Sequence, residues 1–318
     1  MNTLGITGAT GLIGARFLKH WLESHPDTQV RCSSRSGSVL PRHEQLEWLQ
    51  GDLSNEADCR EFVEGLDAVI HLAHANSPAT SNRHWSSDLA ANLVPTLTLL
   101  EALRQRKTDQ ICHLVFASSG GAVYGRKNGD GTTFAEADPC HPLSPYGIQK
   151  LALEHYLATA CVQGWLRATV LRLSNVYGTL LAVERRQGLI GVALARILSN
   201  QPVRVYGPLS NVRDYLHVDD VARAFGAALL PCGQSSAKAN FRVFNIGAGR
   251  GHSVAEVLEL IERVTGKNVR TEVSGFGAAA FSSLPTVVLS IEKAGQELLW
   301  APQIELEEGV TSLWKQNL

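Results

Sequence analysis

The 318-residue sequence lacks long apolar runs, and its first residues lack the charged and apolar regions of a signal peptide. No run approaches the roughly 18 consecutive apolar residues that indicate a membrane-spanning helix. The chain instead enters a strand-like segment almost at once. We therefore expect a cytoplasmic protein without membrane contact.

The sequence also lacks paired metal ligands and an excess of charge of either sign. Its six cysteines are scattered without a Cys-x-x-Cys pair, so we expect reduced core residues rather than a disulfide or zinc framework. His71 and His74 have no partner ligand at a useful spacing, and we predict no metal site. The formal net charge of -1 and the sequence pI of about 6.8 provide no basic field for nucleic acid.

A glycine-rich turn follows the first predicted strand, Leu4 to Thr7, and leads into a helical pattern that ends near Pro26. Glycines let the backbone approach a pyrophosphate, whose negative charge then faces the helix N-terminus. The spacing is Gly-x-x-Gly-x-x-Gly, which differs from the tighter dinucleotide fingerprint. We predict a phosphate cradle formed by Gly8, Thr10, Gly11, Leu12, Ile13 and Gly14.

Residues at the ends of the next strands are candidates for the rest of a dinucleotide site. The predicted strand 29–34 ends at Ser34 and is followed by Arg35, where an acidic residue would bind a ribose 2′-hydroxyl. An arginine without a carboxylate favours a 2′-phosphate, hence NADP over NAD, although Arg35 is equally compatible with a solvated loop. Asp52 is placed to meet the adenine edge, and Ala73 to lie under the nicotinamide ribose.

Strands alternate with helices from residue 1 to about residue 175, which is typical of an α/β fold with a doubly wound parallel sheet. We expect a dinucleotide-binding Rossmann domain at residues 1–178, completed by roughly 214–248. A smaller α/β substrate-binding domain is expected at 179–213 and 249–318. Its last amphipathic helix is predicted near 291–299.

The pair Tyr146 and Lys150 lies four residues apart on a predicted helix, and therefore on one face of it. Lowering a tyrosine pKa from ~10 to ~7 requires about 4 kcal/mol. A cation at ~5 Å supplies roughly 3 kcal/mol at an effective dielectric constant of ~20. An oxidised nicotinamide ring would supply the remainder. The pattern predicts a proton acceptor beside a dinucleotide, and the alternative is a surface helix that carries this spacing by chance.

With these motifs in place, the chain resembles the extended short-chain dehydrogenase/reductase family, in particular its NAD-dependent epimerase/dehydratase branch with the UDP-glucose 4-epimerases. The matching segments follow the family's order from residue 7 to residue 247. They are 7–14, Gly51-Asp52-Leu53, His71-Leu72-Ala73, Asn92, Ser118-Ser119, Val123-Tyr124-Gly125, Ser144-Pro145-Tyr146-Gly147, Lys150, 172–178, 213–220 and Asn245-Ile246-Gly247.

The resemblance implies roles for these positions. Tyr146 would be the acid/base on a sugar hydroxyl, assisted by Lys150 and a serine hydroxyl, and Asn175 and Arg213 would hold the nucleotide diphosphate. Further cofactor-binding residues would be Ser34, Arg35, Asp52, Leu53, Leu72, Ala73, Asn92 and Ser118, together with Tyr146 and Lys150. The family also implies a homodimer through helices at 85–106 and 146–163.

Three departures from the family pattern shape the prediction. Gly120 stands where many relatives carry the catalytic hydroxyl, so we assign that role and substrate contact to Ser119, with Ser118 as its structural neighbour. Gly121-Ala122 replaces the Asp-Glu pair of sugar dehydratases, which disfavours dehydration. Residues 280–283 replace the C-terminal Arg-x-Gly-Asp clamp, so the substrate is held differently or is not a UDP-sugar.

We therefore expect a nucleotide-sugar 4-epimerase of the UDP-hexose class that uses bound NAD or NADP. The first alternative is an NADPH-dependent reductase of a 4-keto-6-deoxy nucleotide sugar, for which Ser34-Arg35 is the evidence. The second is a catalytically silent dinucleotide sensor, which the intact Tyr146 and Lys150 disfavour. We also expect Asp219 or Asp220 to cap the helix that follows them.

Overall fold

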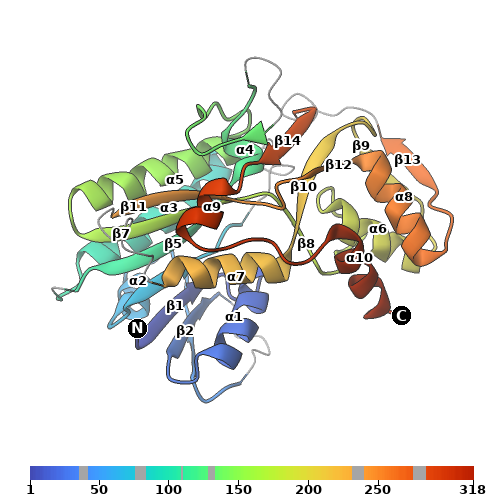
Figure 1. Cartoon of the computed structure of the whole chain (residues 1–318). Coiled ribbons are helices and arrows are strands. Elements are labelled where there is room, and N and C mark those ends of the chain that lie inside the picture. The colour runs from blue at the N-terminus through green and yellow to red at the C-terminus, as the bar shows by residue number, and fades with distance from the viewer. Residues whose placement is uncertain (36–41, 76–83, 109, 128–132, 231–239, 275–283) are drawn as a thin grey trace.

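A seven-stranded parallel sheet forms the centre of the computed structural model, which describes residues 1–35, 42–75, 84–108, 110–127, 133–230, 240–274 and 284–318 (Figure 1). The strand order is β11-β7-β5-β4-β1-β2-β3, so the chain winds outward in both directions from β1 and β4. This confirms the doubly wound Rossmann sheet. Its strands are β1 (Thr3–Thr7), β2 (Gln29–Ser34), β3 (Leu46–Gln50), β4 (Ala68–His71), β5 (Cys112–Ser119), β7 (Leu166–Leu173) and β11 (Phe241–Ile246).

Helices cover both faces of this sheet, and each face has its own apolar core (Figure 1). The core on one face includes residues of α1 (Leu12–Ser24), α7 (Val218–Leu229) and α9 (Glu292–Glu297). The other core includes residues of α2 (Glu56–Val63), α3 (Trp85–Arg104) and α5 (Pro145–Val162). The central strands are consequently buried on both sides, which explains the nearly continuous apolar runs of β4 and β5.

Two smaller sheets and three helices lie beyond the carboxyl ends of the central strands. A five-stranded sheet contains β6 (Thr133–Phe134), β8 (Asn175–Tyr177), β10 (Val212–His217), β12 (Gly251–Ser253) and β14 (Thr286–Leu289). A two-stranded sheet pairs β9 (Val203–Tyr206) with β13 (Thr271–Ser274). The helices α6 (Leu189–Leu198), α8 (Val254–Thr265) and α10 (Leu306–Lys315) share a third apolar core.

The C-terminal part of the chain differs from the expectation. Residues 291–299 contain α9, but α10 follows it, so the predicted last helix is not the last one. The apolar side chains of α10 repeat at helical spacing, at Leu306, Val310, Leu313 and Trp314, and all four are buried. This spacing is a signal that the sequence contains and that the prediction missed.

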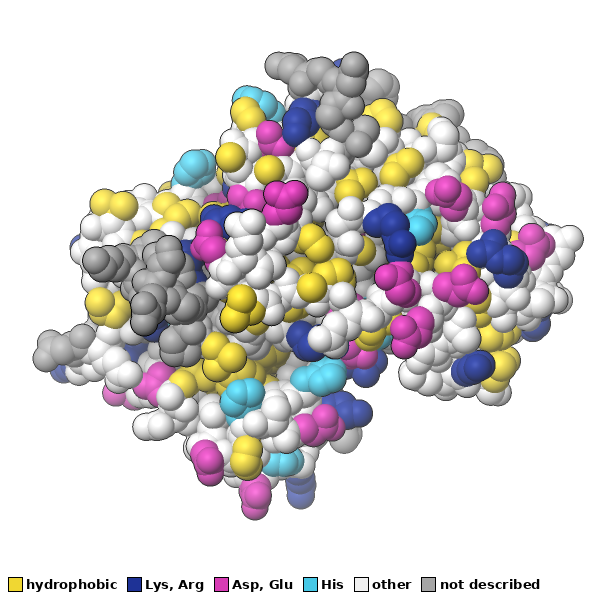
Figure 2. All heavy atoms as spheres, in the orientation of Figure 1, with side chains coloured by type: hydrophobic (Ala, Val, Ile, Leu, Met, Phe, Trp, Pro, Cys, Tyr) yellow, Lys and Arg dark blue, Asp and Glu magenta, His cyan; other side chains and the backbone are white. Residues whose placement is uncertain are grey.

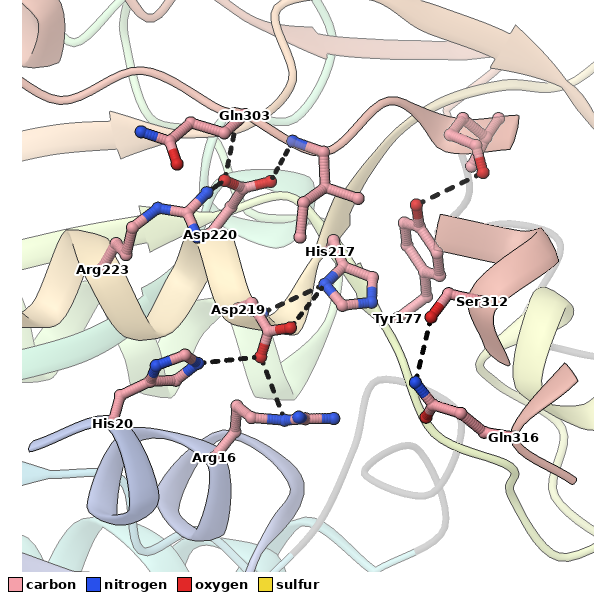
Figure 3. Close-up of polar contacts among 12 residues, drawn as sticks. Arg16, His20, Tyr177, His217, Asp219, Asp220, Arg223, Gln303, Ser312 and Gln316 are labelled. Carbon is pink, nitrogen blue, oxygen red and sulfur yellow. Dashed lines mark hydrogen bonds and ion pairs between the residues drawn. The ribbon is translucent and has the colours of Figure 1, made fainter. Parts of the chain in front are cut away.

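Asp219 and Asp220 do not cap α7, contrary to the expectation. The N-cap is His217, whose Nδ1 accepts a hydrogen bond from the Asp219 backbone N–H at 3.3 Å. Asp219 instead reaches α1, where its Oδ1 lies 3.1 Å from Arg16 Nε and 3.1 Å from His20 Nε2 (Figure 3). A carboxylate in the first helical turn is favourable in either case, because it faces the positive end of the helix dipole.

Asp220 is fully buried and binds the segment between α9 and α10 (Figure 3). Its carboxylate accepts backbone hydrogen bonds from Gln303 at 2.8 Å and Ile304 at 3.1 Å, and it pairs with Arg223. Its own carbonyl oxygen accepts a bond from Trp300 Nε1 at 3.0 Å. The two aspartates therefore hold α7 to α1 on one side and to the C-terminal segment on the other.

The surface mixes charges of both signs. On the face shown in Figure 2, basic and acidic side chains are interspersed, in keeping with the formal net charge of -1. Among the helices that the structure describes, none has both the length and the apolar composition needed to cross a bilayer.

Candidate active site

The glycine turn lies between β1 and α1, at the carboxyl end of a central strand. Gly8 has a positive φ of 72°, and its carbonyl oxygen accepts a hydrogen bond from the Gly11 N–H at 3.0 Å. A Cβ atom added to Gly14 would lie 2.3 Å from that carbonyl oxygen, so the turn has no room for a larger residue there. Gly11, the N-cap of α1, offers no side-chain hydrogen bond to the first helical turn. A pyrophosphate fits this turn, because Gly8 and Gly14 leave no room for a side chain and the amides of the first turn have no side-chain cap.

Further predicted cofactor residues line the same edge of the sheet. Ser34 ends β2, Arg35 is exposed, and Asp52 follows β3. Hydrogen bonds from Ser54 lower the pKa of Asp52, with a smaller contribution from the charge of Arg35. Ala73 follows β4, and its backbone N–H donates to Thr7 Oγ1 at 3.3 Å.

The predicted catalytic residues come from two adjacent elements. Ser119 is the last residue of β5 and is half-buried, whereas Tyr146 and Lys150 belong to the first turns of α5. The Ser144 side chain begins α5 as its N-cap, accepting the Gly147 N–H at 3.1 Å. Lys150 is buried, and its Nζ lies 5.7 Å from the centre of the Tyr146 ring. The structure thus brings the three side chains together.

The protein groups by themselves do not make the Tyr146 phenol acidic, contrary to our electrostatic expectation. Burial raises the pKa of Tyr146 to about 12, and hydrogen bonding with the Ser119 side chain opposes the shift. Burial also lowers the pKa of Lys150 to about 7, so its charge is not complete at neutral pH. The Lys150 ammonium moreover donates to the carbonyl oxygen of Ala117 at 2.8 Å. The expectation omitted the desolvation of both groups, which sequence spacing does not reveal.

A buried polar network lies next to the predicted catalytic residues. The Glu154 carboxylate accepts hydrogen bonds from Ser118 Oγ at 2.5 Å and from Arg172 Nη2 at 2.7 Å. Arg172 Nη1 donates to the Tyr124 hydroxyl at 3.0 Å, which donates in turn to Asn245 Oδ1 at 2.6 Å. Ser118 is therefore engaged inside the protein, which supports Ser119 as the hydroxyl that faces a substrate.

Three other predicted residues contact the chain itself. Asn92 Oδ1 accepts the backbone N–H of Ala75 at 2.6 Å, and Asn92 thus fixes the segment after β4. Asn175 Nδ2 donates to the Asp214 carbonyl oxygen at 3.1 Å, and Arg213 Nη1 to the Val212 carbonyl oxygen at 2.7 Å. These bonds use main-chain acceptors of the smaller sheet. The predicted replacement at 280–283 lies outside the described residues.

The turn after Ser119 carries no acid or base. It forms the short helix α4 (Gly120–Val123), which consists of two glycines, an alanine and a valine. A Cβ atom at Gly120 would lie 2.6 Å from Leu289 Cδ1, so a serine or threonine at this position would require the Leu289 side chain on β14 to shift.

His71 and His74 lie in different surroundings. His71 is hydrogen-bonded through Nδ1 to Thr7 Oγ1 at 2.7 Å and through Nε2 to Thr96 Oγ1 at 2.9 Å. His74 instead lies against Tyr146, a contact that the sequence analysis missed because it weighed the residue only as a metal ligand. Across the described part of the chain, no group of three or more His, Cys, Asp or Glu side chains is arranged to hold a metal ion.

Comparison with known proteins connects this geometry to a family. Residues 4–247 match the NAD dependent epimerase/dehydratase family. The chain is 28% identical to the dTDP-4-dehydro-6-deoxyglucose reductase of Escherichia coli, over 99% of this chain and 97% of the relative. It is also 28% identical to the UDP-glucose 4-epimerase of Thermotoga maritima, solved with UDP-glucose, at a TM-score of 0.86 and with 99% of both chains covered.

A second solved structure agrees with the first. The UDP-glucose 4-epimerase of Thermus thermophilus, solved as a complex with NAD, is 28% identical at a TM-score of 0.83, covering 99% of this chain and 100% of the other. Because the family match spans most of the chain, including both the glycine turn and the Tyr146 helix, the protein belongs to the NAD-dependent epimerase/dehydratase family of extended short-chain dehydrogenases/reductases.

Proposed function

We propose that the protein is a nucleotide-sugar 4-epimerase of the UDP-hexose class. The observation that carries the proposal is the meeting of Ser119, Tyr146 and Lys150 beside a turn, Gly120–Val123, that holds no carboxylate. Proton transfer on a sugar hydroxyl needs side chains such as Ser119, Tyr146 and Lys150. Elimination of water, the dehydratase reaction, would in addition need an acid or base in the turn.

The residues present fit a nicotinamide dinucleotide. The turn at 8–14 would hold the pyrophosphate, Asp52 and Leu53 the adenine side, and Leu72, Ala73 and Lys150 the nicotinamide ribose. When bound, the dinucleotide supplies a hydride acceptor that later returns the hydride. We infer NADP as the favoured cofactor because Arg35 is exposed at the end of β2.

The chain's own residues would then transfer one proton to and from the sugar. Tyr146 takes the proton of the sugar O4 hydroxyl when C4 loses its hydride, and gives it back when C4 regains a hydride on its opposite face. Ser119 holds the same oxygen, and the Lys150 ammonium stabilises the ionised phenol. Asn175 and Arg213 hold the diphosphate while the sugar turns over, so binding energy remote from the ring permits its rotation. No net oxidation results.

A second candidate is a reductase of a 4-keto-6-deoxy nucleotide sugar that consumes NADPH. The same Ser34-Arg35 pair favours it, because an enzyme that recycles its cofactor gains little from NADPH. The name of the Escherichia coli relative points the same way. Both candidates use Tyr146 and Lys150 on the same oxygen, and they differ in whether the hydride returns to the sugar that supplied it.

One experiment separates the two candidates. UDP-glucose, UDP-galactose and their N-acetyl forms are incubated with the enzyme and NAD or NADP, and the sugar configuration is followed by NMR. We expect interconversion of one pair, and a loss of at least about 100-fold in Tyr146→Phe. The absence of change in every sugar would refute the epimerase. A stoichiometric loss of 340 nm absorbance on a 4-keto-6-deoxy sugar with NADPH would establish the reductase.

The proposal extends to the assembly and to the division of the chain. We propose a homodimer through α3 and α5, which pack against each other in each protomer. Residues 179–213 and 249–318 would form the substrate-binding unit, since the core shared by α6, α8 and α10 lies within them apart from Tyr177 and Tyr215.

A further inference from the structure

His74 lies beside Tyr146 and has a ring nitrogen without a partner in the part of the chain that the structure describes. It follows β4 by three residues, at the carboxyl edge of the sheet where ligands bind in this fold. The rings of His74 and Tyr146 are 5.0 Å apart and inclined at 81°, so they meet edge to face. His74 Nε2 is buried and makes no hydrogen bond with the described residues. Three residues earlier, His71 has both nitrogens bonded to threonines.

A buried nitrogen without a partner is costly, and folded proteins rarely keep one. At an edge of the sheet where ligands bind, a bound group can complete the hydrogen bond. His74 cannot serve by charge, because burial and the nearby Lys150 ammonium lower its pKa to about 2. The ring is therefore neutral at physiological pH and offers one N–H donor and one acceptor nitrogen. A hydroxyl group satisfies either nitrogen, because it both donates and accepts.

We propose that His74 is a specificity residue that hydrogen-bonds, through Nε2, a sugar hydroxyl neighbouring the one on which Tyr146 acts. This inference rests on the proposed function and names a feature of the substrate, a free hydroxyl within reach of His74. Sugars that lack this hydroxyl would leave Nε2 unpaired and would be rejected. The ring of His74 would also keep the phenol in place, but that packing does not depend on a nitrogen.

Two variants separate the hydrogen bond from the packing. His74→Phe keeps a ring against Tyr146 and removes both nitrogens, whereas His74→Gln keeps a polar atom near the place of Nε2 and removes the ring. The substrates are UDP-glucose and its 2-, 3- and 6-deoxy analogues. The readout is the ratio of kcat/KM for UDP-glucose to that for each analogue, which a loss of folding or of general activity leaves unchanged.

We expect the wild-type enzyme to prefer UDP-glucose over the 3-deoxy or the 6-deoxy analogue by about tenfold or more, as for the loss of one buried hydrogen bond. In His74→Phe the ratio of kcat/KM values falls to about one for the same analogue. In His74→Gln most of the wild-type preference for UDP-glucose is restored. The 2-deoxy analogue, whose missing hydroxyl does not neighbour O4, is the control. Ratios that are the same in the wild type and in His74→Phe would overturn the inference and leave the epimerase standing.

Binding measurements keep the two proposals distinct. Calorimetric titration with UDP-glucose and the three analogues is carried out on the wild type and on His74→Phe. If no sugar is turned over but the selectivity of binding depends on His74, the epimerase fails and the inference holds. If neither protein distinguishes the analogues, or neither binds any of them, the inference fails.

Discussion

Arg172 on β7 binds the carboxylate of Glu154 on α5 at 2.7 Å, with side chains that are only 7% and 4% exposed. Because Ser118 Oγ donates to the same carboxylate, the pair connects the end of β5 with the helix that carries Tyr146 and Lys150. The negative charge of Glu154 also raises the pKa of Lys150, against the larger effect of burial. This ion pair therefore helps to fix the end of β5, with Ser119, relative to the start of α5, with Tyr146.

Replacing Glu154 with alanine is expected to lower the free energy of unfolding by about 3–5 kcal/mol, because it leaves the Arg172 charge buried without a partner. Urea denaturation at pH 7 measures the loss. The matched control is Glu56→Ala, which breaks an exposed pair with Arg60 and is expected to cost no more than about 0.5 kcal/mol. A similar decrease in the free energy of unfolding in the two variants would show that the buried Glu154 pair contributes no more to stability than an exposed pair.

Buried neutral histidines predict acid instability. Burial lowers the pKa values of His71 and His113 to about 3 each, from the ordinary value of 6.5. Between pH 6.5 and about 3 the unfolded chain binds protons that the folded protein does not, so stability falls as the pH falls. Each histidine contributes a slope of about 1 kcal/mol per pH unit.

Urea midpoints at pH 7, 6 and 5 test this expectation. In His113→Gln, whose side chain can still reach Thr169, the dependence of stability on pH should decrease by the contribution of one histidine. His155→Gln, at an exposed position on α5, should leave the slope as it is. An unchanged slope in His113→Gln would mean that another group controls the acid transition.

The glycine turn gives a third prediction. Gly14→Ala places a Cβ atom 2.3 Å from the Gly8 carbonyl oxygen and 2.7 Å from Ala9 Cα, and both neighbours are backbone. The turn must open, and we expect the Kd for NAD and NADP to rise by at least about tenfold, measured by calorimetry. Gly226→Ala on α7 is the control, since its nearest neighbour is Trp21 Cζ3 at 3.9 Å. It should leave the Kd unchanged and raise stability by up to about 1 kcal/mol.

Local patterns predicted the elements that carry the site. The strand before Gly8, the turn itself and the helix after it lie next to one another in the chain, so their order alone defines them. The same holds for α5, whose start is marked by the N-cap Ser144 followed by Pro145. The functional role of these residues stays a prediction, because sequence order does not show what they bind.

Interactions between distant segments could not be predicted in this way. The Tyr146 and Lys150 pKa values depend on burial by other elements, which the estimate from spacing left out. From the sequence alone, Asp219 was predicted to cap α7, because its partners Arg16 and His20 lie about 200 residues away in the chain and could not be recognised. The contact of His74 with Tyr146 likewise joins the segment after β4 to α5 and leaves no local pattern.

The cofactor preference can be tested at Arg35. Arg35→Ala should raise the Kd for NADP by about tenfold or more and leave that for NAD almost unchanged, because only the 2′-phosphate offers a charge-assisted hydrogen bond. Ser34→Asp should act in the same direction by repelling the phosphate. Calorimetric titration with both dinucleotides measures the two constants. An equal loss of affinity for NAD and NADP would show that Arg35 does not contact the 2′-phosphate of the ribose.

The exposed apolar side chains of α3 and α5 predict the assembly. Large apolar residues are exposed along both helices, at Trp85, Leu89, Val94, Ile148, Tyr156 and Val162. Because exposed apolar surface of this kind marks interfaces, we expect a dimer at micromolar concentration that buries both helices. Leu89→Arg combined with Tyr156→Arg places charges in that interface, and sedimentation equilibrium should then give the mass of one chain. Leu299→Arg is the control, since Leu299 is 88% exposed but lies outside α3 and α5, and this variant should sediment as a dimer. A wild-type protein that sediments as a monomer, or a double variant that sediments as a dimer, would exclude this interface.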